Sequence, residues 1–192
     1  MDGNWLRIDS AVIDAPDPCP IPKKLEGLPG KLIYFSLGSM SSSYKPLMDR
    51  LLKILAELPH RFIISTGFYH DEYNLSANLY GEQYVSQLAV LQLVDCFITH
   101  GGNNSVTEAC HFGVPMIVCP LFGDQHNNAA RIEEKRCGKQ FDPFTCTKSD
   151  LEQAIEFCGS ANVKARLKSM SDRMKKENNL KSVCESIVNL IK

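Results

Sequence analysis

The chain has 192 residues, of which 44% are hydrophobic and 22% are charged, so it can bury one sizeable core but not two full-sized domains. Its formal net charge of −1 excludes the broad basic surface of a nucleic-acid-binding protein, and no dense lysine or arginine tract favours a membrane surface. We therefore expect no nucleic-acid partner, and any anionic ligand must be held by a local site.

The first ten residues, MDGNWLRIDS, lack the basic and apolar regions of a signal peptide, and no apolar stretch reaches membrane-spanning length. The eight cysteines are widely spaced, without C-x-x-C pairs or the Cys/His spacing of a zinc site. Several lie in apolar runs, where a free cysteine behaves as a small hydrophobic residue. We expect a soluble chain with reduced thiols, a cytoplasmic location and no bound metal.

Residues 11–30 contain five prolines, which fix φ and remove backbone donors. This composition excludes a helix or a central strand and indicates a linker. We predict two parts: an N-terminal segment with a proline-rich interdomain linker at residues 1–30, and a folded domain with a helical tail at residues 31–192.

Apolar runs and helix-period segments alternate along the rest of the chain. We predict strands at residues 31–37, 61–65, 95–99 and 114–119, each ending at a polar, Gly- or Pro-marked turn. Helical spacing of apolar residues predicts helices at residues 47–58, 151–158 and 180–191, and residues 104–112 have the length of a crossover helix. The many Lys and Arg residues at 164–181 indicate a solvated helix face.

Strands that alternate with helices predict an α/β fold with a parallel sheet flanked by helices on both faces. Ligands of such sheets bind beyond the carboxyl ends of the strands. Three predicted strands end in small and polar residues, at positions 36–39, 99–105 and 119–125. These turns are the expected site.

The second of these turns, THGGNNS, is the most informative. Two glycines allow the backbone to approach a ligand closely, and Asn104 or Ser105 can begin a helix whose first N–H groups are unpaired. Such a helix start favours a phosphate. An alternative remains open, because Ser105-Val-Thr-Glu108 is also a capping-box pattern in which Glu108 returns to a backbone N–H.

The pattern THGG-N-NS-xx-E-xxxx-G-VP followed by P-xxx-DQ-xx-NA resembles the signature of UDP-glycosyltransferases of the GT-B fold. The upstream FSLGS and YVSQLAVL segments match the same family in order and spacing. The resemblance covers about residues 16–141 and implies a Rossmann-like, C-terminal donor-binding domain. The sequence departs from many members at Tyr84, Ser86 and Leu93, where they have Trp, Pro and His. The spacing from Tyr84 to His100 is similar to that of bacterial macrolide-type transferases.

The resemblance also implies a role for each matched residue. Tyr84 would stack on the uracil, Gln87 would lie near the base and ribose, and Glu108 would bind the ribose hydroxyls. The diphosphate would be held by Ser39, His100, Gly102, Asn104 and Ser105. Asp124 and Gln125 would bind the sugar hydroxyls. These roles suit an aromatic face, a carboxylate acceptor and a histidine donor beside the leaving UDP.

Structural alternatives exist for three of these residues. Tyr84 could be a half-buried strand aromatic, and His100 could be a satisfied core histidine. Asp124 could serve only as the N-cap of a helix that begins at Gln125. A further alternative is that the glycine-rich turns bind no ligand at all. UDP binding by the chain, weakened by His100→Ala, would exclude this alternative.

The resemblance implies an enzyme domain that transfers a hexose, glucose or glucuronic acid, from UDP to a small lipophilic acceptor. In this family the base that deprotonates the acceptor belongs to a preceding N-terminal domain, so no catalytic residue is expected here and this chain alone should turn over little. No metal or other cofactor is expected, since the UDP-sugar is itself the substrate. The alternative is a non-catalytic UDP-sugar-binding module that acts with a separate acceptor-binding chain.

Overall fold

The computed structural model describes residues 12, 16–176 and 180–191, and the predicted N-terminal segment at residues 1–11 and 13–15 lies outside them. Six strands form one sheet in the order β3-β2-β1-β4-β5-β6, and every neighbouring pair is parallel. The strands are β1 (Leu32–Ser36), β2 (Arg61–Ser65), β3 (Leu79–Glu82), β4 (Cys96–Thr99), β5 (Met116–Val118) and β6 (Gly138–Gln140). The predicted α/β class with a parallel sheet is confirmed.

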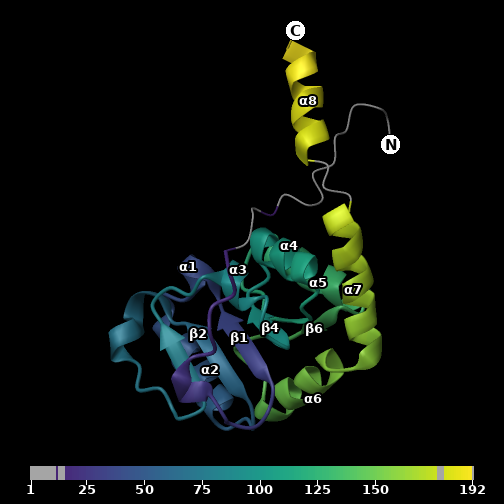
Figure 1. Cartoon of the computed structure of the whole chain (residues 1–192). Coiled ribbons are helices and arrows are strands. Elements are labelled where there is room, and N and C mark those ends of the chain that lie inside the picture. The colour runs from purple at the N-terminus through teal and green to yellow at the C-terminus, as the bar shows by residue number, and fades with distance from the viewer. Residues whose placement is uncertain (1–11, 13–15, 177–179, 192) are drawn as a thin grey trace.

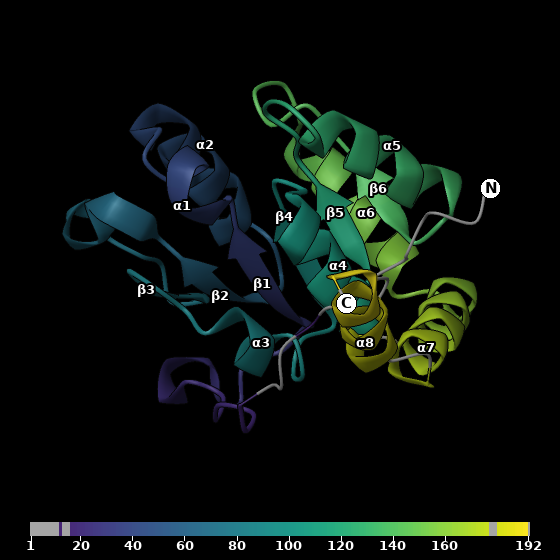
Figure 2. The same cartoon turned by 90° about the horizontal axis from the view of Figure 1, so that it is seen from above.

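Helices connect the strands and cover both faces of the sheet (Figure 1; Figure 2). They are α1 (Gly38–Ser41), α2 (Lys45–Ala56), α3 (Gln87–Val90), α4 (Asn103–Phe112), α5 (Gln125–Glu134), α6 (Lys148–Cys158), α7 (Ala161–Lys176) and α8 (Leu180–Ile191). Two short 3₁₀ segments, η1 (Lys23–Leu25) and η2 (Gly67–Glu72), lie in the connections. Among the described residues, no helix is both long and apolar enough to cross a membrane.

The sheet divides the core into two layers because successive strand residues point to opposite faces. On β1, Ile33 and Phe35 pack with apolar side chains of α2 and α6, whereas Leu32 and Tyr34 pack on the other face with α4 and α7. All five residues of β1 are buried, as expected of a strand at the centre of a parallel sheet. This rigid double-layered sheet fixes the positions of the turns that leave its strands.

The proline-rich segment lies against the domain. Leu25 of η1 is fully buried in the core layer of α4 and α7, and Cys19, Ile21 and Leu28 pack against the same layer. The described part of the segment is therefore packed against the domain and contributes no strand to the sheet.

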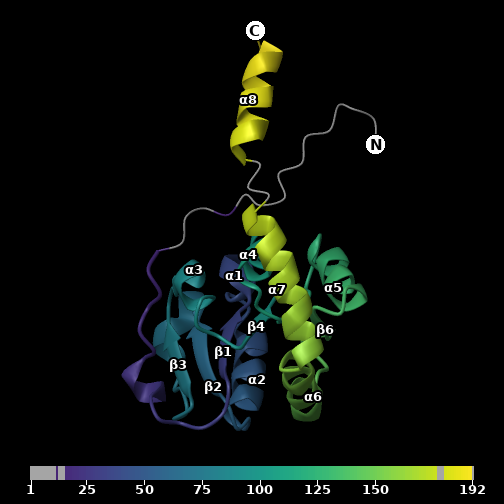
Figure 3. The same ribbon diagram turned by 45° about the vertical axis from the view of Figure 1, so that its right-hand side comes forward.

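Helix α7 contains residues 164–176 of the lysine- and arginine-rich stretch that was expected to form a solvated helix face. Its outer face is polar, but Val163, Leu167 and Met174 are buried against the layer that contains α4. Helix α8 extends away from the rest of the fold (Figure 1; Figure 3). All eight cysteines are free, and Cys96, Cys119 and Cys158 are among those buried in the core.

Candidate functional site at the carboxyl edge of the sheet

The order of the strands reverses between β1 and β4, which follow each other in space but not in sequence. The connection after β1 leads to one side of this point and the connection after β4 leads to the other, so a crevice opens at the carboxyl ends of the two strands. The predicted polar turns after β1, β4 and β5 therefore lie side by side, because these three strands are neighbours.

The turn after β4 requires glycine. Gly101 has φ +86°, and a Cβ atom at this position would lie 2.5 Å from Cγ1 of Val118. Gly102 is the N-cap of α4, and no side chain caps this helix. Its first backbone bond runs from Val106 N–H to the Gly102 carbonyl, at 3.0 Å. The N–H groups at the start of α4 are thus left for a ligand, which is the arrangement that favours an anion.

The capping-box alternative is wrong. Helix α4 begins at Asn103, so Ser105 lies inside its first turn and is not the N-cap. Glu108 Oε2 accepts a hydrogen bond of 2.6 Å from Nε2 of Gln87, whose side chain also lies 3.3 Å from Ser105 Oγ. Glu108 is therefore bonded to a side chain on α3 and not to the backbone N–H that the capping-box pattern predicts.

His100 is half-buried between two glycines. A Cβ atom on Gly38 would lie 2.7 Å from Cε1 of His100, and a Cβ atom on Gly102 would lie 2.6 Å from its Nε2. Burial lowers the pKa of His100, although a hydrogen bond with the Ser36 backbone and the charge of Asp124 act in the opposite direction. The ring borders two hollows and is therefore not fully enclosed in the core, although it has polar neighbours in the Ser36 backbone and in Thr99, whose Oγ1 lies 3.5 Å from its Nδ1.

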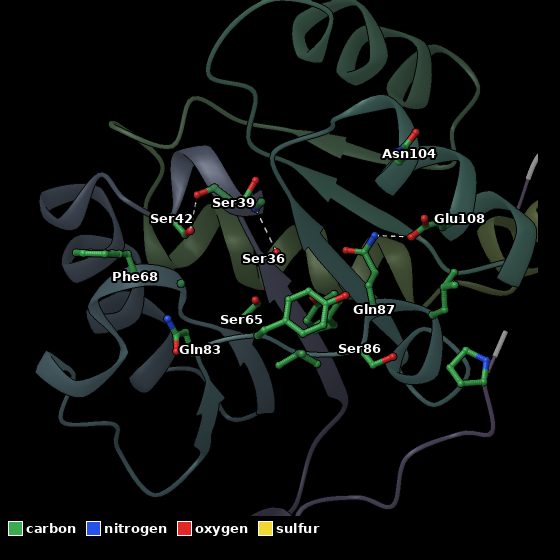
Figure 4. A pocket seen from close by; sticks show the side chains of 17 residues that line it. Ser36, Ser39, Ser42, Ser65, Phe68, Gln83, Ser86, Gln87, Asn104 and Glu108 are labelled. Carbon is green, nitrogen blue, oxygen red and sulfur yellow. Dashed lines mark hydrogen bonds between the residues drawn. The ribbon is translucent and has the colours of Figure 1, made fainter. Parts of the chain in front are cut away.

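The largest of the hollows at this edge of the sheet has a volume of about 880 Å³ and lies over the carboxyl ends of β1 and β2. Figure 4 shows polar side chains converging on it from several elements, with Gln87 reaching towards Glu108. Tyr84 follows β3 and is 79% exposed, so the alternative of a half-buried strand aromatic is wrong. Five predicted site residues line this hollow: Ser39, Tyr84, Gln87, Asn104 and Glu108.

Two smaller hollows continue the site. One, of about 310 Å³, lies at the start of α4 and is lined by His100, Gly102, Asn103, Asn104 and Ser105. The other, of about 190 Å³, we call the acid–amide hollow; its lining includes Ser39, His100, Gly102, Asp124 and Gln125. Because the three hollows share lining residues, the ten predicted site residues border one continuous surface.

The acid–amide pair lies where β5 leads into α5. Asp124 is exposed at the N-cap position, but its side chain caps no backbone N–H and accepts instead from Asn128 Nδ2 at 3.2 Å. Asp124 is thus the N-cap residue of a helix that begins at Gln125, as the alternative proposed, but its side chain makes no capping hydrogen bond. Gln125 is buried, and its Oε1 accepts from the backbone N–H groups of Leu121 and Phe122 at 2.8 and 3.1 Å. Its amide nitrogen is the group left to donate to a ligand.

Phe68, which was not among the residues predicted from the sequence, lines the largest hollow and is 75% exposed. It lies in η2, directly after the Thr66-Gly67 turn that ends β2. Ligands bind at the carboxyl ends of strands, and this rule applies to β2 as well. The turn after β2 could therefore have been predicted as part of the site. Within the described residues, no group of three or more His, Cys, Asp or Glu side chains could hold a metal ion.

The fold and its polar edge define this chain as a Rossmann-like α/β domain of the kind found in glycosyltransferases. A solved structure described as the glycotransferase of kitacinnamycin superposes with a TM-score of 0.78 and 26% identity, covering 90% of this chain and 45% of that one. The calicheamicin glycosyltransferase shares the fold, with a TM-score of 0.74 and 19% identity over 91% of this chain.

The family model described as UDP-glucoronosyl and UDP-glucosyl transferase matches residues 22–181, so the chain belongs to the UDP-glycosyltransferase family. It is 34% identical over 145 residues to UDP-glucuronosyltransferase 2B16 of Oryctolagus cuniculus, covering 71% of this chain and 28% of the relative. It is 31% identical over 166 residues to an uncharacterized UDP-glucosyltransferase, YdhE, of Bacillus subtilis, covering 84% and 42%. The chain thus spans less than half the length of these relatives.

Proposed function

We propose that this chain binds a UDP-sugar along the three connected hollows and stabilises the departing UDP while a hexose moves to a small lipophilic acceptor. The observation that carries the proposal is the uncapped start of α4 beside His100, at the point where the strand order reverses. Membership of a UDP-glycosyltransferase family supports it. The eight free cysteines support a cytoplasmic setting.

In this proposal the diphosphate lies at the N-terminus of α4. The free N–H groups at this end carry a partial positive charge, and charge-assisted hydrogen bonds to them contribute about 1.5–3 kcal/mol each before desolvation. His100 donates an N–H to the phosphate oxygens on which negative charge grows as the bond to the sugar breaks. Such preorganised donors lower the barrier because they need no rearrangement during the reaction.

The nucleoside lies in the largest hollow. Tyr84 offers an exposed aromatic face for the uracil, and Glu108, oriented by Gln87, accepts hydrogen bonds from the ribose hydroxyls. The hexose lies in the acid–amide hollow, where Asp124 accepts from its hydroxyls and the Gln125 amide donates to them. No metal ion or cofactor has a part in this scheme.

We further propose that the chain alone transfers little or no sugar. The side chains that could act as a base in the hollows, His100, Glu108 and Asp124, all have donor-binding roles in the scheme. The acceptor site and its base would come from an N-terminal domain that is not among these residues.

Titration with UDP by calorimetry tests the binding proposal, with His100→Ala as the variant that should weaken it. Absence of UDP binding by the wild-type chain would contradict the proposal and favour a purely structural role for the glycine-rich turns. A transfer assay with and without an added acceptor-binding half tests the second part. Ordinary turnover by residues 1–192 alone would overturn our assignment of roles.

A further inference from the structure

The proline-rich segment borders the largest hollow. Pro16 is among the residues that line this hollow, together with Ser86, Gln87 and Leu88 around the start of α3. Pro16 belongs to the stretch that was predicted to be a linker, so no part in ligand binding was expected of it. The remaining lining residues all come from the folded domain at residues 31–192. One side of the hollow is therefore completed by the linker.

A single side chain holds Pro16 at the rim of the hollow. Gln92, in the turn directly after α3, donates from Nε2 to the Pro16 carbonyl at 2.9 Å and to the Leu88 carbonyl at 3.1 Å. A glutamine amide has two N–H donors, so these two bonds use both of them. Pro16 and Leu88 line the hollow, whereas Gln92 does not. Gln92 thus joins two residues of the rim from outside the hollow.

The chain that follows Pro16 is stiff and well anchored. Prolines at every second position from 16 to 22 fix φ at those residues. Cys19 and Ile21 pack against the core layer of α4 and α7, and Leu25 is buried in that layer. Few conformations remain between these anchors and Pro16, so the hydrogen bond from Gln92 fixes the ring of Pro16 at a small cost in entropy.

We propose that Pro16 forms a wall of the nucleoside site and that Gln92 is the positioning residue that holds this wall in place. The inference rests on the proposed binding of UDP, in which the nucleoside occupies the largest hollow. The apolar ring of Pro16 shields the nucleoside from water, which strengthens the contacts that Tyr84 and Gln87 make with it. The hollow at the start of α4, where the diphosphate is proposed to lie, is not lined by Pro16. Loss of the wall should therefore weaken binding of the nucleoside and not that of the diphosphate.

Calorimetry with the intact chain tests this inference, with UDP and inorganic diphosphate as probes. Gln92→Leu keeps a side chain of similar size but removes both donors, and Pro16→Gly removes the ring. Each variant should bind UDP about threefold or more weakly, with the affinity for diphosphate unchanged. Gln153→Leu is the matched control, because Gln153 is exposed on α6 and its Nε2 donates to Ser149 Oγ, four residues earlier, at 3.2 Å. This control should leave UDP binding unchanged.

The double variant separates a positioning role from a general structural one. If Gln92 acts through Pro16, adding Gln92→Leu to Pro16→Gly should change UDP affinity little further. Pro16 and Gln92 are both exposed, so the melting temperatures should stay close to that of the wild type. Additive losses of UDP affinity would overturn the positioning role, and equal losses of UDP and diphosphate affinity would overturn the nucleoside wall.

The outcomes separate this inference from the proposed function. If the wild-type chain does not bind UDP, the proposed function fails and this inference fails with it. If the wild type binds UDP and both single variants bind it as tightly, only the wall formed by the proline-rich segment is overturned. The double variant gives the answer on Gln92 even if diphosphate alone binds too weakly to be measured.

Discussion

Gln87 at the start of α3 donates a hydrogen bond of 2.6 Å to Glu108 on α4, joining two residues 21 positions apart across the largest hollow (Figure 4). The bond leaves one carboxylate oxygen of Glu108 for another partner, and it fixes the direction in which that oxygen points. The side-chain amide of Gln87 on α3 thereby positions the carboxylate acceptor of Glu108 on α4.

Replacement of Glu108 by Ala should separate ligand binding from helix stability. Because Glu108 caps no backbone group, we expect the melting temperature to change little, whereas a lost bond between a carboxylate and the ribose should lower UDP affinity about tenfold or more. Calorimetry and thermal melting measure the two effects. Glu156→Gln, at an exposed position of α6, is the control, and a large loss of stability with unchanged UDP affinity would contradict the ribose role.

Replacement of Tyr84 by Ala should reduce UDP affinity with little effect on folding. The side chain is 79% exposed, so its removal should change stability by no more than about 0.5 kcal/mol. Stacking of an aromatic ring on a base contributes about 1–3 kcal/mol, so UDP should bind at least about fivefold more weakly.

Tyr84→Trp should retain the affinity, because it keeps an aromatic face. Phe144→Ala removes another half-exposed aromatic that lies outside the three hollows and should have no effect on UDP binding. Equal affinities of the wild type and Tyr84→Ala would show that the base lies elsewhere.

The strands and helices with strong periodicity could be predicted from the sequence. The buried run of β2 was predicted with the bounds it has, and α4 begins one residue before the predicted start. The short strands β3 and β6 were missed because each offers only three or four residues, of which Lys139 and Gln140 are polar. They are held in the sheet by pairing with β2 and β5, which no local pattern reveals.

The site was predictable as a set of turns but not as a set of contacts. The turns that follow β1, β4 and β5 lie side by side as expected, since parallel strands end at one edge. The Gln87–Glu108 hydrogen bond and the contribution of Phe68 depend on how α3 and η2 pack beside the sheet. The local capping-box pattern therefore predicted a backbone partner for Glu108, whereas its partner in the tertiary structure is the side chain of Gln87.

A methyl group on Gly38 should displace the ring of His100. Gly38 has φ +75°, so Gly38→Ala combines backbone strain with a contact of 2.7 Å to that ring. Gly27→Ala is a matched control, because Gly27 has φ +72° and nothing lies within 4 Å of the added Cβ. Both variants should lose about 1–2 kcal/mol to strain, but only Gly38→Ala should also weaken UDP binding. Similar UDP affinities in the two variants would argue against the placement of His100 beside the diphosphate.

Stability should fall as the pH drops below 6.5. Burial lowers the pKa of His60, His100 and His111 from the usual 6.5, so below this value the unfolded chain binds protons that the folded chain does not. The free energy of unfolding therefore decreases as the pH falls. The stabilisation that comes from these three histidines is fully present only above pH 6.5. Urea denaturation at pH 7.5 and 5.5 measures the difference.

The contribution of His100 can be isolated with UDP. A bound diphosphate favours the protonated ring, so it should raise the pKa of His100 and reduce the fall in stability between pH 7.5 and 5.5. His100→Gln should remove this effect of UDP, whereas His126→Gln, an exposed position on α5, should preserve it. The carboxylates whose pKa is lowered, Glu134 and Asp150, lose their stabilising effect only at more acidic pH, so they do not obscure this range. If UDP changes the pH dependence equally in both variants, the diphosphate does not lie against His100.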